Sequence, residues 1–105
     1  MKILLDQGAP APLRLHHESD DVDTASELGW ATYTNGRLLD AAEAASYEAL
    51  ITTDQNLQHQ QNLSDRRLRI LVPTSTSWPK ISKKIPDIKA ALSNMEVGEL
   101  IELAV

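Results

Sequence analysis

Short apolar runs that alternate with helix-forming stretches constrain the fold of this chain more than any other feature. The runs that are mainly apolar or β-branched occupy residues 2–5, 49–53 and 68–72. A strand that is covered on both faces has this composition, whereas a strand with one face in water alternates apolar and polar residues. The pattern therefore predicts the central strands of a parallel sheet, in which Leu4, Ile51 and Leu71 are buried.

Helix-forming segments lie between these runs. The segment 37–46 is rich in helix formers, and its apolar residues, Leu38 and Ala42 among them, share one face. A later helix begins at Trp78, and Pro86 is expected to kink it or to split it in two. The remaining predicted elements are short helices at 10–17 and 55–63 and strands at 21–25 and 99–103.

Strands that alternate with helices predict an α/β fold, with a mainly parallel sheet and helices on both of its faces. The chain has 105 residues and contains no repeat, low-complexity tract or linker, so we expect a single domain over 1–105. A domain of this size buries a smaller share of its surface than a larger one does. Because association would add buried surface, we expect a homodimer.

Charge and composition narrow the class of protein. The formal net charge is -5, and there are no cysteines, which excludes disulfides, thiolate metal sites and a cysteine nucleophile. The acidic balance argues against non-specific binding of nucleic acid by the bulk surface. The first apolar run is too short for a signal peptide, and no run approaches the roughly 20 residues of a membrane helix. We therefore expect a cytoplasmic protein that does not enter a membrane.

Two aspartates stand at the ends of apolar runs. Asp6 directly follows the first run, and Asp54 directly follows the run at 49–53. Because the carboxyl ends of parallel strands meet at one edge of a sheet, where ligands of α/β proteins bind, we expect both carboxylates in one cleft. Mg²⁺ prefers carboxylate oxygens and retains several waters. The alternative is that each aspartate only ends its strand and caps the following turn.

A family resemblance extends over nearly the whole chain. The segments that carry it are KILLDQGAP, ELGWATYTNGRLLDAA, ALITTDQNLQHQQNL, WPKI and GELIEL. Together they resemble the small PIN-like family of uncharacterised bacterial proteins, relatives of the PIN-domain ribonucleases found as toxins in toxin–antitoxin pairs. The resemblance implies a three-layer α/β/α sandwich with a mainly parallel central sheet. It also implies an acidic cleft that binds Mg²⁺ or Mn²⁺.

Position by position, the resemblance assigns the catalytic acids to Asp6 and Asp54. The family's middle acid falls near Asn35 and a further acid falls at Asn56, so both positions carry amides here. Gln7 stands where relatives often carry glutamate. Since amide oxygens can also ligate a hard cation, the metal site implied by the resemblance comprises Asp6, Asp54, Asn35 and Asn56.

Three further residues are candidates for contact with substrate. Arg37 is expected at the start of the helix that brings the middle acid to the cleft. Its guanidinium either points inward, in the place of a cation, or outward towards Asp40 or solvent. Gln58 and His59 follow Asp54 and either contact RNA or form structural hydrogen bonds.

Two functions follow from these observations. The first is a metal-dependent endoribonuclease that cleaves RNA, acting as the toxin of a pair with an antitoxin-type protein partner. The second is a catalytically inactive PIN-like protein that serves as a binding or assembly partner, because fold alone does not determine activity. The retained acids favour the nuclease. The amides at Asn35 and Asn56, together with Arg37, favour the inactive protein.

Overall fold

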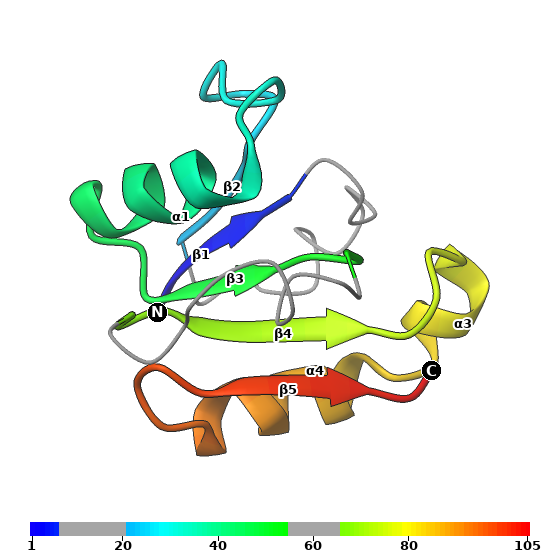
Figure 1. Cartoon of the computed structure of the whole chain (residues 1–105). Helices are drawn as coiled ribbons and strands as arrows, with labels where there is room; N and C mark the ends of the chain where they lie inside the picture. Colours follow the sequence, from blue (N-terminus) through cyan, green and yellow to red (C-terminus); the bar gives the residue numbers. More distant parts are fainter. Residues whose placement is uncertain (7–20, 55–65) are drawn as a thin grey trace.

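The computed structural model describes residues 1–6, 21–54 and 66–105. These residues form five strands and three helices (Figure 1). The strands are β1 (Lys2–Leu5), β2 (Asp21–Thr24), β3 (Ala49–Ile51), β4 (Arg69–Pro73) and β5 (Leu100–Leu103). The helices are α1 (Asn35–Ala44), α3 (Trp78–Ser82) and α4 (Ile85–Asn94).

The five strands form one sheet in the order β2-β1-β3-β4-β5, and every neighbouring pair is parallel. All five carboxyl ends consequently lie along one edge of the sheet (Figure 1). In the register between the two central strands β1 and β3, Leu5 lies opposite Ile51. Asp6 and Thr52 are therefore the next residues along this pair, at the carboxyl edge.

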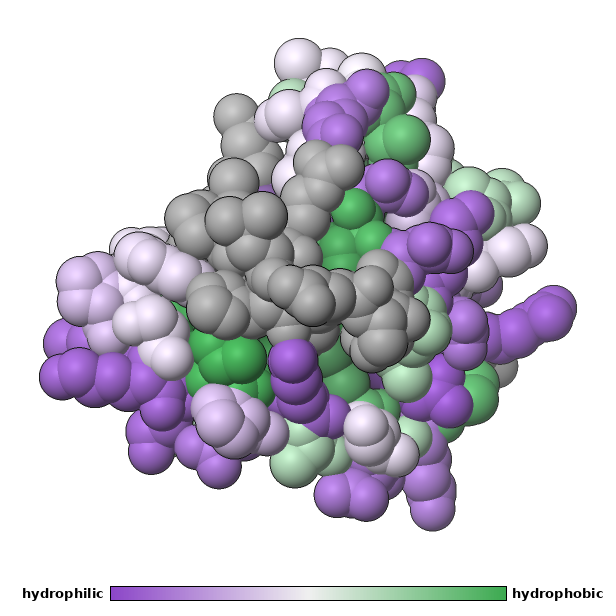
Figure 2. Space-filling model, turned by 180° about the vertical axis from the view of Figure 1, so that it is seen from behind, coloured by the Kyte–Doolittle hydropathy of each residue, from purple (hydrophilic) through white to green (hydrophobic). Residues whose placement is uncertain are grey.

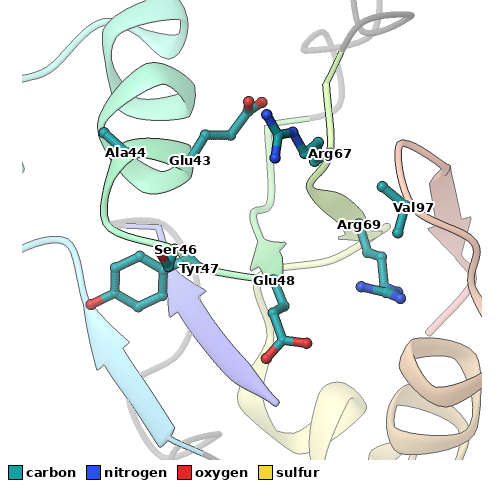
Figure 3. Close-up of a pocket in the computed structure, with 8 residues that line it drawn as sticks. All are labelled: Glu43, Ala44, Ser46, Tyr47, Glu48, Arg67, Arg69 and Val97. Atoms are coloured by element: carbon teal, nitrogen blue, oxygen red, sulfur yellow. The ribbon is translucent and has the colours of Figure 1, made fainter.

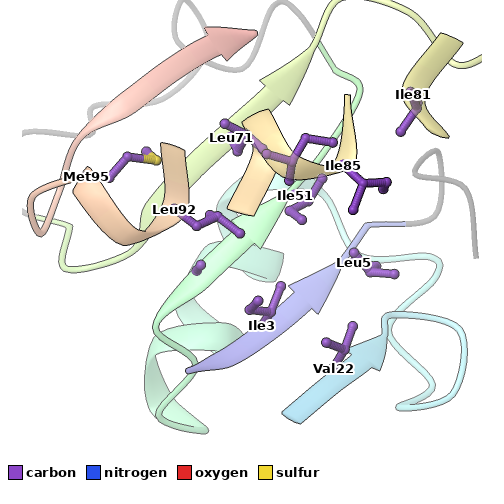
Figure 4. Close-up of a cluster of buried hydrophobic side chains, with 11 residues drawn as sticks. Ile3, Leu5, Val22, Ile51, Leu71, Ile81, Ile85, Leu92 and Met95 are labelled. Carbon is purple, nitrogen blue, oxygen red and sulfur yellow. The ribbon is translucent and has the colours of Figure 1, made fainter. Parts of the chain in front are cut away.

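Helices cover both faces of the sheet. On one face, Leu38, Leu39 and Ala42 of α1 pack against strand residues that include Leu4 and Leu50. The opposite face is covered by α3 and α4. The buried side chains on that face are Ile3, Leu5, Val22, Ala49, Ile51, Leu71, Ile81, Ile85, Ile88, Leu92 and Met95 (Figure 4). Successive strand residues point to opposite faces, so neighbouring apolar residues in one run enter both cores.

The predicted parallel sheet is confirmed, and Leu4, Ile51 and Leu71 are each fully buried in it. The last helical segment is split rather than kinked. Pro86 lies in the first turn of α4, where its missing N–H leaves no helical hydrogen bond unmade. The predicted helices at 10–17 and 55–63 lie outside the described residues.

One predicted strand is shorter than expected. The run at 49–53 was expected to continue as a strand up to Asp54, whereas β3 ends at Ile51. The Thr52 amide still donates to the carbonyl of Leu71, but the residues after it leave the sheet. Asp54 is thus held by the loop that follows β3 rather than by the strand itself.

The surface seen from behind carries hydrophilic side chains around its outline (Figure 2). Among the described residues, few large apolar side chains are exposed, the clearest being Val97 at 58%. None of the helices in the described ranges is both long enough and apolar enough to cross a bilayer.

Candidate functional site

The hydroxyl of Thr52 connects the two aspartates at the carboxyl edge. Thr52 is buried, and its Oγ1 donates a hydrogen bond of 2.7 Å to Oδ2 of Asp6. The same oxygen accepts a hydrogen bond of 3.2 Å from the backbone N–H of Asp54. A single side chain therefore holds the Asp6 carboxylate and the Asp54 backbone beside one another.

The backbone explains why Asp6 lies at this point. Its amide donates to the carbonyl of Ile51 at 2.9 Å, which continues the β1–β3 ladder by one residue. From the end of β1, the Asp6 side chain extends towards Thr52, in the loop that follows β3. Both aspartates are partly buried, so their carboxylates are accessible to a small ion and partly shielded from bulk water.

Thr52 was not among the site residues suggested by the sequence. It lies in an apolar and β-branched run, and such a run predicts only a strand. The informative signal was the polar pair Thr52-Thr53 immediately before an acid, since a hydroxyl at the end of a buried strand requires a hydrogen-bond partner.

The structure describes the other predicted site residues only in part. Asn35 is the first residue of α1, on a helix that packs beside β1, and its side chain lies outside what the structure describes. Asn56, Gln58 and His59 also lie outside the described residues. Among the predicted site residues, the structure thus places the Asp6 carboxylate beside the backbone of Asp54, with Thr52 between them.

Arg37 takes the outward alternative, with its side chain exposed to solvent. Its guanidinium carbon lies 4.1 Å from the centroid of the Tyr33 ring, and the side chain is exposed. Asp40 instead accepts a hydrogen bond from Arg66. Of the two outward alternatives, Arg37 takes solvent rather than Asp40: it lies on the Tyr33 ring in a cation–π contact, while Asp40 pairs with Arg66.

Three aromatic side chains, Trp30, Tyr33 and Tyr47, contact one another near Arg37. Trp30 is stacked on Tyr33, with ring centroids 5.9 Å apart, and meets Tyr47 edge-on. Lys2 Nζ lies 4.4 Å from the centre of the Tyr47 ring and donates to the carbonyl of Ala45. Trp30 and Tyr33 are therefore engaged in packing against the α1 core rather than presented for base stacking.

The donor groups at the carboxyl edge suit a hard cation. The described ranges contain no group of three His, Cys, Asp or Glu side chains placed to hold a metal ion. Asp6 and Asp54 nevertheless supply only carboxylate oxygens, and Mg²⁺ is commonly held by one or two carboxylates with waters completing its shell. This donor chemistry fits Mg²⁺ or Mn²⁺ and does not resemble a nitrogen- or sulfur-ligated site.

The chain matches no protein-family model, and neither a curated protein nor a solved structure is significantly similar to it. The family resemblance consequently rests on the sequence motifs alone. The parallel α/β fold and the geometry around Thr52 stand independently of that resemblance.

Proposed function

We propose that this chain is a PIN-like endoribonuclease that depends on Mg²⁺ or Mn²⁺, with Asp6 and Asp54 as its acidic residues. The observation that supports the proposal most is the shared Thr52 hydroxyl, which joins both aspartates at the carboxyl edge of adjacent parallel strands. Ligands of open α/β sheets bind outside this edge. The motif resemblance adds the reaction class.

The bound ion would be held by the carboxylates of Asp6 and Asp54, with Asn35 and Asn56 as further oxygen donors. When bound, such an ion activates water and neutralises the charge that develops on a phosphodiester during hydrolysis. The chain itself contributes orientation. The Thr52 hydrogen bond fixes the orientation of the Asp6 carboxylate at the edge.

The outward position of Arg37 is compatible with this proposal. An inward guanidinium would neutralise the carboxylates and compete with the ion, whereas a guanidinium on the Tyr33 ring is positioned away from that role. From there Arg37 can contact RNA phosphate, with Gln58 and His59 as further substrate contacts. The toxin role, the antitoxin-type partner and the homodimer belong to the same proposal and rest on the resemblance and on the size of the domain.

The alternative function is a catalytically inactive PIN-like protein that binds a partner. It is favoured by the small number of charges at the edge, since two carboxylates with amides at Asn35 and Asn56 bind a divalent ion more weakly than four acids would. The two functions differ in metal binding and in cleavage, so both quantities are to be measured on the same preparations.

The decisive experiment is calorimetric titration with Mn²⁺ beside cleavage of a mixed-sequence single-stranded RNA. The nuclease proposal expects saturable Mn²⁺ binding and metal-dependent cleavage, both lost in Asp6→Asn and Asp54→Asn. Asp87→Asn is the matched control, because Asp87 is exposed on α4 and, among the residues that the structure describes, forms only a long ion pair with Lys84. Cleavage that persists in Asp6→Asn, or a wild type that neither binds Mn²⁺ nor cleaves, would reject the nuclease.

A further inference from the structure

A pocket of about 610 Å³ opens at the edge of the sheet opposite to Asp6 and Asp54. It lies between the end of α1, the residues that precede β3 and β4, and the turn before β5 (Figure 3). Because all strands are parallel, residues that precede them gather at the amino edge, as the two aspartates gather at the carboxyl edge. The volume is in the range of small-molecule sites.

Two arginines, Arg67 and Arg69, line this pocket and can attract an anion. Within the described part of the chain, the guanidinium of Arg67 has no hydrogen-bond or ion-pair partner. Arg69 donates through Nε to the carbonyl of Met95 at 3.0 Å, which fixes the side chain, and its terminal nitrogens form no hydrogen bond within the described ranges. A planar guanidinium held in this way is suited to a carboxylate, which it can bind through two parallel hydrogen bonds.

Two glutamates, Glu43 and Glu48, line the same pocket. Oε1 of Glu43 is buried and accepts no hydrogen bond within the described residues, although Arg66 Nη1 lies 3.5 Å away. Glu48 accepts a hydrogen bond from the backbone N–H of Lys2 and is otherwise exposed. The Glu43 side chain as a whole is 25% exposed, so a ligand N–H group can approach its carboxylate beside the Arg66 contact.

The opposite charges face one another without pairing. The side chains of Glu43 and Arg67 point towards each other across the pocket (Figure 3), yet among the described residues the ion pair of Glu43 is with Arg66. A ligand that carries both a negative and a positive group can lie between them and meet both. The exposed side chain of Val97 adds an apolar surface to the same pocket.

We propose that this amino-edge pocket binds a small zwitterion with an apolar side chain, of the kind that a free α-amino acid presents. Its carboxylate accepts hydrogen bonds from Arg67, its ammonium group donates to Glu43, and its side chain contacts Val97. This site is separate from the acidic edge and does not depend on the proposed nuclease activity.

The test is a titration of the full chain followed by two-dimensional amide NMR, with L-leucine, isocaproate and inorganic phosphate as probes. Isocaproate has the carboxylate and the apolar part of leucine but no ammonium group. L-leucine is expected to shift amides around residues 46–48 and 67–69 saturably, and isocaproate to bind about fivefold more weakly, as an exposed ion pair of up to about 1 kcal/mol would give.

Variants separate the two charge contacts. Arg67→Gln is expected to weaken both organic probes about fivefold, and Glu43→Gln to remove the preference for leucine over isocaproate. Lys89→Gln, on the exposed surface of α4, changes the charge equally and is expected to leave binding unchanged. The proposal is overturned if leucine causes no saturable shift at millimolar concentration. It is equally overturned if phosphate or isocaproate binds as well as leucine, or if Lys89→Gln weakens leucine as much as Arg67→Gln.

Discussion

The hydroxyl of Tyr47 donates a hydrogen bond of 2.6 Å to Oδ2 of Asp23. Asp23 is in the edge strand β2, and Tyr47 is in the connection between α1 and β3, so the bond ties an outer strand to the helix layer. Tyr47 is buried, and its burial, its bond to Asp23 and the negative charges of Asp23 and Glu27 all raise the pKa of its hydroxyl above the ordinary value.

This shift predicts a loss of stability in alkali. Below the ordinary tyrosine pKa of about 10, Tyr47 is neutral in both the folded and the unfolded chain, and its contribution is fully present. Above that pH the unfolded chain ionises first, so the free energy of unfolding falls until the raised pKa of the folded state is reached. Urea denaturation at a series of alkaline pH values is expected to show a steeper fall for wild type than for Tyr47→Phe. An equal fall in stability for wild type and Tyr47→Phe would contradict a raised pKa of the Tyr47 hydroxyl.

The Thr52 hydroxyl offers a second test of the carboxyl edge. Thr52→Val keeps the shape of the side chain but removes the donor to Asp6 and the acceptor for the Asp54 amide, and we expect a loss of about 1 to 3 kcal/mol in the free energy of unfolding. Thr53→Val is the matched control. Within the described residues the Thr53 hydroxyl forms no hydrogen bond, so its replacement is expected to change stability little. Similar losses in the two variants would show that the two hydrogen bonds of the Thr52 hydroxyl contribute little to stability.

Arg37 provides a prediction about metal binding. Since its guanidinium lies on Tyr33, Arg37→Glu is expected to alter the Mn²⁺ affinity by less than about threefold, because solvent screens an exposed charge at a distance. The loss of the cation–π contact is expected to lower stability by about 0.5 to 1 kcal/mol. Calorimetry and chemical denaturation measure the two effects. A tenfold gain in affinity would mean that Arg37 enters the acidic edge.

Ser46 occupies a backbone conformation that favours glycine. Its φ is 66°, and it follows the C-cap of α1, where its amide donates to Glu43 and the Tyr47 amide donates to Ala42. This is a Schellman motif with serine in the left-handed position. Ser46→Gly is therefore expected to raise the free energy of unfolding by about 0.5 to 1 kcal/mol. Ala41→Gly, inside the same helix, is expected to lower it by about 1 kcal/mol. A destabilised Ser46→Gly variant would contradict this reasoning.

Gly98 and Gly29 form a matched pair with different surroundings. Both have positive φ, but a Cβ at Gly98 would lie 2.6 Å from the backbone oxygen of Arg66, whereas a Cβ at Gly29 would meet nothing within 4 Å. Gly29→Ala is expected to cost about 1 kcal/mol from backbone strain alone. Gly98→Ala adds a clash with backbone and is expected to cost about 2 kcal/mol or more. Thermal denaturation of the two variants compares them directly, and equal losses would refute the predicted contact.

The local sequence determined the elements of the sheet. The apolar runs around Leu4, Ile51 and Leu71 could be interpreted as central parallel strands, because burial on both faces requires apolar residues at every position. Pro86 marked the division of the last helix for an equally local reason, since proline cannot continue a helix but can begin one. Asp6 could be placed at the carboxyl edge from its position after the first run.

Tertiary structure decided which side chains meet. Thr52 and Asp6 are 46 residues apart, and Arg66 and Asp40 are 26 apart, so their contacts depend on the strand order β2-β1-β3-β4-β5 and on its register. A sequence pattern records how each segment distributes apolar and polar residues, but not which segments become neighbours. The hydrogen bonds of Thr52, the outward position of Arg37 and the amino-edge pocket therefore depend on how the strands are arranged in the tertiary structure.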